Sequence, residues 1–261
     1  MSPVLFLFLT HLGVGIVMTL LVVSRAAGVK FFRFNAGLAL VLLVVGLAVG
    51  PSFPSGHAAL RLMVACFVVA TAAIGLYWGI SGRILPRLRA PLVWTAAIAG
   101  TVGIVSQASW MPEGFGRSQQ MLTAASFVTS AALLGGACTA MVLGHWYLVL
   151  PSMDVGHLKR IVRFHLVSLA VRIVLVALVV SLAVTAEGPF ARYVTSVAGV
   201  FFWQRVLFGL AAPAVLAWLT WQTAKINSTQ SATGILYVDF FTVIVGEVLA
   251  KYLLLVTSVP V

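Results

Sequence analysis

Apolar runs of about twenty residues recur along the whole chain, and this pattern restricts the fold more than any other feature. Hydrophobic residues make up 62% of the chain and charged residues only 8%. Helical runs of this length match the thickness of a bilayer. The sequence therefore predicts an all-α fold: a polytopic membrane helix bundle of about eight transmembrane helices in a single integral membrane domain, residues 1–261, with possible halves 1–110 and 121–261. The predicted spans are residues 3–23, 35–50, 58–80, 91–109, 121–149, 164–185, 196–222 and 232–256.

Basic residues are distributed unequally between the two sides of this predicted bundle. Loops rich in Lys and Arg usually remain in the cytoplasm, and here they lie on the side opposite the two termini. Both termini are therefore predicted to be external. The formal net charge of +11 is then a topology signal, and no nucleic acid is expected as a partner. The lipid bilayer is predicted to be the bacterial cytoplasmic membrane, the cell inner membrane. Ten basic residues lie in the predicted cytoplasmic loops and two in the external loops: Arg25, Lys30, Arg33, Arg83, Arg87, Arg89, Lys159, Arg160, Arg163 and Lys225, against Arg117 and Arg192.

The segment from Pro54 to Ala58 reads Pro-Ser-Gly-His-Ala and resembles the middle signature of the type 2 phosphatidic acid phosphatases. That resemblance implies that His57 assists a second, nucleophilic histidine in a distal Ser-Arg…His…Asp element, while an earlier Lys…Arg-Pro element holds the phosphate. Here the only Ser-Arg pair begins at Ser24, before the signature, and no Arg-Pro follows Lys30 at the family's spacing. We therefore predict that the segment is a structural turn.

Charged residues within the predicted spans are concentrated in the second half of the chain. A charged side chain at the bilayer centre costs about 2.5–3.5 kcal/mol on insertion scales, so such residues usually pair inside the bundle. Glu247 and Lys251 are one turn apart on the last span, and Arg205 lies in the same outer half, so a buried ion pair among them is predicted. Arg172 and Asp239 have similar depths and could pair with each other. Such pairs serve either to fix helix register or to form a site.

Two histidines are predicted to lie at nearly the same depth on neighbouring helices. His145 is near the end of the fifth span and His165 begins the sixth span across a short loop. A neutral imidazole pair at matched depth is what ligation of haem b requires. The alternative is that both are interfacial residues beside the lipid headgroups, where Trp146 and Tyr147 are also at home. His11, inside the first span, is expected to hydrogen-bond to another helix.

The same region suits a quinone, whose carbonyls need hydrogen-bond donors and whose chemistry needs a group that exchanges protons. His145, Trp146, Tyr147, Arg172 and Asp239 are the residues predicted to supply these. Eight spans with charges concentrated in one four-helix half loosely resemble the quinol-handling membrane subunits of bacterial respiratory complexes in the polysulfide-reductase class. This architectural resemblance implies an electron-transport subunit that binds quinol or haem b and docks other membrane or redox subunits.

Two other functions remain open from the sequence. A proton- or cation-coupled transporter or channel would use Asp239 and Glu247, and a membrane scaffold or assembly protein would have no chemistry. The short loops argue against a large catalytic domain, so whether the chain is an enzyme stays open. Gly46-x-x-x-Gly50 and Gly75-x-x-x-Gly79, in the second and third spans, indicate either close packing within the bundle or specific dimerisation.

The charge asymmetry generates a topology prediction. A periplasm-active reporter fused after Val261 is expected to be active, because the basic loops hold the other side of the bundle in the cytoplasm. A cytoplasm-active reporter fused at the same residue should be inactive. The reverse pattern of the two reporter activities would contradict the predicted orientation.

Overall fold

The computed structural model describes residues 3–50, 58–109, 116–150, 153–185 and 189–261. Within these ranges, eight helical segments are long and apolar enough to cross a membrane, which confirms the predicted polytopic bundle. The turn predicted around His57 lies outside the described residues. The elements are α1 (Pro3–Leu20), η1 (Arg25–Ala27), α2 (Val29–Ala48), α3 (Ala58–Ile80), α4 (Pro86–Ala108), α5 (Arg117–Val149), α6 (Gly156–Thr185), α7 (Pro189–Thr195), η2 (Val197–Gly199), α8 (Val200–Val206), η3 (Leu207–Ala211), α9 (Ala212–Lys225) and α10 (Thr229–Thr257).

Helices are the expected form for these segments because hydrocarbon offers no partners to backbone N–H and C=O groups, and a helix satisfies both internally. Several helices extend beyond the predicted spans, and α6 begins at Gly156 rather than near residue 164. The seventh segment, Val197–Lys225, is interrupted: the π-helix η3 separates α8 from α9. Single π-turns inside helices are frequent at functional sites.

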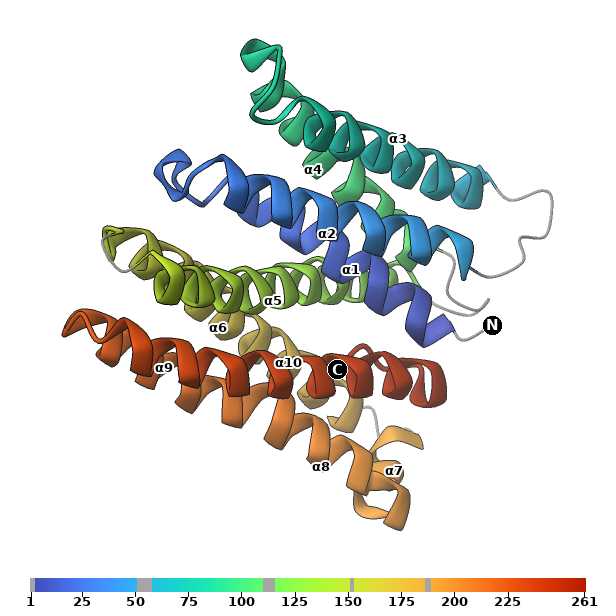
Figure 1. Ribbon diagram of the computed structural model, residues 1–261. Coiled ribbons are helices and arrows are strands. Elements are labelled where there is room, and N and C mark those ends of the chain that lie inside the picture. The colour runs from blue at the N-terminus through green and yellow to red at the C-terminus, as the bar shows by residue number, and fades with distance from the viewer. Residues whose placement is uncertain (1–2, 51–57, 110–115, 151–152, 186–188) are drawn as a thin grey trace.

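The long helices run alternately up and down, so their connections gather at two ends (Figure 1). One end carries the connections α1–α2, α3–α4, α5–α6 and α9–α10, and we call it the basic end because the ten basic residues lie there. Helix α5 lies in the middle of the bundle, where it packs against α1, α4, α6 and α10. The helices before and after residue 110 therefore share one packed core.

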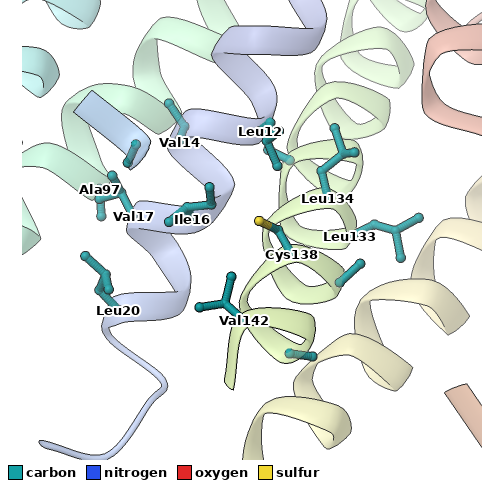
Figure 2. Close-up of a cluster of buried hydrophobic side chains, with 14 of the residues drawn as sticks. Leu12, Val14, Ile16, Val17, Leu20, Ala97, Leu133, Leu134, Cys138 and Val142 are labelled. Atoms are coloured by element: carbon teal, nitrogen blue, oxygen red, sulfur yellow. The ribbon is translucent and has the colours of Figure 1, made fainter. Parts of the chain in front are cut away.

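A very close helix crossing in that core joins α1 to α5. Leu12 and Ile16 on α1 and Leu134 and Cys138 on α5 are buried there (Figure 2). The two backbones meet at Gly15 and Gly135, where a Cβ on either glycine would overlap the backbone of the facing helix. Small residues allow this approach because van der Waals packing, rather than exclusion of water, drives helix association in lipid.

The α1–α5 crossing generates a stability prediction. Gly15→Ala should lower the free energy of unfolding by roughly 1–3 kcal/mol, because the new methyl group would force α1 away from the carbonyl of Ala131. Gly79→Ala is the matched control, since no heavy atom lies within 4 Å of a Cβ at that position. Thermal unfolding in detergent measures both variants. Equal stabilities would show that the close crossing does not hold in the folded protein.

Candidate functional site: a buried ion cluster and its polar chain

Four ionisable side chains from three helices meet inside the bundle, and we call them the ion cluster: Glu247 and Lys251 on α10, Arg172 on α6 and Arg205 on α8. Glu247 is at the centre. Its Oε1 accepts hydrogen bonds from Arg205 Nη2 at 2.9 Å and from Arg172 Nε at 3.2 Å. Its Oε2 accepts from Lys251 Nζ at 3.3 Å and from Arg172 Nη2 at 3.4 Å. No side chain of the cluster is more than 3% exposed, so one buried carboxylate faces three buried cations.

Arg205 reaches Glu247 because α10 and the interrupted seventh segment almost touch at two glycines. A Cβ on Gly246 would overlap the backbone of Gly209, and a Cβ on Gly209 would overlap the Arg205 guanidinium. The π-helix η3 begins two residues after Arg205, and Gly209 lies within it. The absence of two side chains thus creates the space that the guanidinium occupies.

The remaining donors of Arg172 point to oxygen atoms. Its Nη1 donates to the Ser126 hydroxyl at 2.6 Å and to the Ser126 carbonyl at 3.1 Å. Its Nη2 also donates to the carbonyl of Val261 at 3.3 Å. A cavity of about 10 Å³ lies beside Arg172 and Lys251 and is lined by Ser126 and Ser130, which is about the smallest space that holds one water molecule. The dipoles of the Ser126 hydroxyl and of the Ser126 and Val261 carbonyls offset part of the positive charge that the single carboxylate of Glu247 does not neutralise.

A line of hydrogen bonds, which we call the polar chain, leads from the ion cluster into the first half of the bundle. Lys251 Nζ donates to Ser130 Oγ on α5 at 2.8 Å, and Ser130 Oγ lies 3.2 Å from His11 Nδ1 on α1. His11 Nε2 lies 3.1 Å from Gln107 Oε1 on α4. With that amide oxygen as acceptor, a neutral His11 donates from Nε2 and accepts on Nδ1. Each hydrogen bond of the polar chain is then donated in the direction away from Lys251. All four residues are buried.

A second buried acid–base pair lies nearer the basic end. His165 Nε2 on α6 is 2.8 Å from Asp239 Oδ2 on α10, and both side chains are fully buried. Asp239 precedes Glu247 by eight residues, which corresponds to about 12 Å along the helix. Gly136 on α5 allows this packing, because a Cβ there would be 3.3 Å from the Cα of His165. Helix α10 therefore presents a carboxylate to the interior at two depths.

The structure brings together Arg205, Glu247 and Lys251 as the sequence predicted, but it gives Arg172 and Asp239 different partners. The two were expected to be able to pair with each other; instead Arg172 joins the ion cluster and Asp239 contacts His165. The reason is the axial position of each group: the guanidinium of Arg172 reaches the depth of Glu247, two helical turns beyond Asp239 on α10.

The remaining residues of the predicted quinone site have separate partners. His145 is exposed at the surface of α5, and its Nδ1 is 2.8 Å from the Tyr237 hydroxyl. Trp146 packs edge-to-face on Phe31, with ring centroids 6.1 Å apart. Tyr147 donates its hydroxyl proton to the backbone carbonyl of Asp154 and so ties the end of α5 to the start of α6. Among the described residues, no hydrogen bond joins these three side chains to Arg172 or Asp239.

His145 and His165 do not fit as the two axial ligands of one haem iron. His165 is fully buried with its Nε2 against Asp239, whereas His145 is exposed and contacts Tyr237. Their imidazoles thus have separate partners. Nor does the described part of the chain hold a group of three or more His, Cys, Asp or Glu residues able to bind a metal ion.

Comparison with known proteins adds no family assignment to this geometry. The chain matches no family model, no curated protein and no solved structure. The site must therefore be interpreted from its own chemistry.

Three residues of the polar chain were not predicted as site residues. The sequence gives no prediction for Ser130 and Gln107, and it predicts for His11 only a hydrogen bond to another helix. Polar residues in apolar spans were the available signal, because Ser130 lies inside the predicted span 121–149 and Gln107 near the end of the predicted span 91–109. That signal does not reveal partners. The three contacts depend on the way α1, α4 and α5 cross, which no local pattern encodes.

The ion cluster generates a double-mutant prediction. Glu247→Gln leaves three buried cations without their carboxylate and should destabilise the protein by about 3–5 kcal/mol. Arg205→Met removes one of those cations, so it should cost less in the Glu247→Gln background than in the wild type. Thermal unfolding of both single variants and of the double variant measures this coupling. The same cycle with Arg192→Met, an exposed cation on α7, is the control and should be additive; additivity in the Arg205 cycle would contradict the ion cluster.

Proposed function

We propose that this protein transfers protons within the membrane, as a proton channel or a proton-coupled transporter. The observation that carries the proposal is the unbroken line of hydrogen bonds from Lys251 through Ser130 to His11. Chains of ionisable and hydroxyl groups inside a bilayer are costly, and they mark ion pathways and proton relays. Each member of this line has a proton that it can exchange.

The elementary step follows from the direction of the hydrogen bonds. The Lys251 ammonium transfers a proton to Ser130 Oγ as the original hydroxyl proton of Ser130 passes to His11 Nδ1. One N–H bond breaks at Nζ and one forms at Nδ1, so Lys251 becomes neutral and His11 becomes an imidazolium. Among the three cations of the ion cluster only Lys251 can take this role, because guanidinium groups keep their protons in proteins. Arg172 and Arg205 instead hold Glu247 in place.

The His165–Asp239 pair extends the proposal toward the basic end. An imidazole in contact with a carboxylate is an acid–base couple that can hold or release one proton. Both this pair and the ion cluster lie on the buried face of α10. Thr242 lies between them and is also buried, with its hydroxyl bonded to the Asp239 carbonyl at 2.8 Å. Two protonatable stations on one helix, separated by about 12 Å, provide successive positions for a proton along α10.

The relay is better supported than the other functions that the sequence left open. Quinol or haem binding needs donors or ligands around a shared space, and the residues predicted for it have separate partners. A scaffold accounts for ion pairs between helices but gives no reason for a line of exchangeable protons across three helices. The cavity beside the cluster, about 10 Å³, suits a proton or one water molecule rather than a larger substrate.

The relay generates a transport prediction. Liposomes containing the wild-type protein and a pH-sensitive dye should acidify faster than empty liposomes when a valinomycin-driven potassium diffusion potential, negative inside, is imposed. Ser130→Ala should slow this flux by roughly tenfold or more, because it removes the hydroxyl that joins Lys251 to His11. Ser168→Ala, another buried serine but on α6, outside the polar chain, should leave the flux unchanged.

Thermal unfolding of each variant verifies that it is folded before flux is compared. Lys251→Met serves as a second variant that removes the exchangeable proton itself. The proposal fails if wild-type liposomes conduct no better than empty ones, or if folded Ser130→Ala protein conducts as fast as the wild type. In either case a folded protein with a coupled ion cluster would favour the scaffold.

A further inference from the structure

A cavity of about 330 Å³ opens at the basic end between the first four long helices, far along the chain from the ion cluster. This volume falls within the range of sites for small ligands, about 300–1,000 Å³. Its lining is amphiphilic. Arg25 and Arg89 contribute positive charge, Tyr77 and Ser81 contribute hydroxyl groups, and most of the remaining lining is apolar, including Trp94.

The cavity is built by the turns that join these helices. Gly28 and Gly82 adopt φ values of +88° and +76°, in the left-handed range that favours glycine. A Cβ on Gly82 would lie 2.5 Å from Val29 Cγ1, so the α3–α4 turn packs closely against the start of α2. Arg89 Nη2 donates to the carbonyl of Ile80 at the end of α3, at 3.4 Å. That bond holds the side chain of Arg89 at the wall of the cavity.

The cations of the cavity have no protein carboxylate near them in the sequence. The first acidic residue of the chain is Glu113, so α1 to α4 contain neither Asp nor Glu. The ion pairs found among the described residues all involve Asp239 or Glu247 in the second half. Arg89 Nε is buried and has no hydrogen-bond partner within the described ranges. A buried charged donor without a partner is costly, which points to an anion supplied from outside the chain.

We propose that this cavity binds an anionic phosphate group, with Arg25 and Arg89 as the charged donors. Arginine forms short charge-assisted hydrogen bonds to phosphate oxygens, and basic pockets between transmembrane helices are suited to lipid headgroups. The phosphate is either the headgroup of an anionic phospholipid, whose glycerol and upper acyl carbons would contact the apolar wall, or a free phosphate. The site is independent of the proton relay, because none of its lining residues belongs to the ion cluster or to the polar chain.

Titration of the purified protein in neutral detergent tests this site. Dioleoylphosphatidylglycerol should raise the thermal unfolding midpoint saturably, because a ligand that binds the folded state stabilises it. The double variant Arg25→Gln/Arg89→Gln should bind about tenfold more weakly or worse, the factor expected for one lost charge-assisted hydrogen bond. Arg83→Gln/Arg87→Gln is the matched control. It removes the same charge from two exposed positions, in the α3–α4 connection and at the start of α4, that do not line the cavity.

Parallel titrations separate the sources of the phosphate. A saturable shift with phosphatidylglycerol alone identifies a lipid headgroup, and the same arginine-dependent shift with inorganic phosphate alone identifies a free anion. Arg25→Gln, at an exposed position, provides the comparison if the double variant does not fold. Three results overturn the proposal: no saturable shift with either probe, an equal shift with zwitterionic phosphatidylcholine, or equal weakening in the two double variants.

Discussion

The carboxylate of Glu247 is the charge on which the second half of the bundle depends. It contacts cations from α6, α8 and α10 itself, so it fixes the mutual position of three helices. In lipid, where removal of apolar surface from water does not drive helices together, such polar contacts and close backbone packing carry the association. The arrangement has a cost, because three cations share one anion. Serine hydroxyl and carbonyl oxygens around Arg172 reduce that cost.

Helices in the two halves of the chain associate through different kinds of contact. Helices α1 to α4 have no carboxylate, and they associate through apolar side chains, glycine contacts such as Gly15 against α5, and a few uncharged hydrogen bonds such as that between His11 and Gln107. Helices α6 to α10 associate around ion pairs. The polar chain is the place where the two regions meet, because His11 and Gln107 belong to the first and Lys251 to the second. A proton path through this chain would thus cross the main interface of the bundle.

Prediction from sequence was accurate for contacts between side chains on the same helix and poorer for contacts between side chains on different helices. Lys251 follows Glu247 by four residues, and any α-helix places these side chains together. Arg172 was assigned a possible partner from depth alone, and it joined Glu247 instead of Asp239. The glycine motifs illustrate the same limit. Gly46 packs closely, with Thr10 Cγ2 3.1 Å from a Cβ at that position, but Gly79 has no heavy atom within 4 Å of its Cβ position. Gly15, which belongs to neither predicted motif, lies at a much closer crossing.

The sequence by itself determined that the chain forms a bundle of about eight membrane helices, because apolar runs of bilayer length leave the backbone no other way to satisfy its hydrogen bonds. It also determined which charges must be hidden from lipid. Only the tertiary structure decided which of them meet, separating His165 with Asp239 from the cluster around Glu247. The physical reason is that a contact between helices depends on their crossing and rotation, which are set by packing over the whole length of each helix.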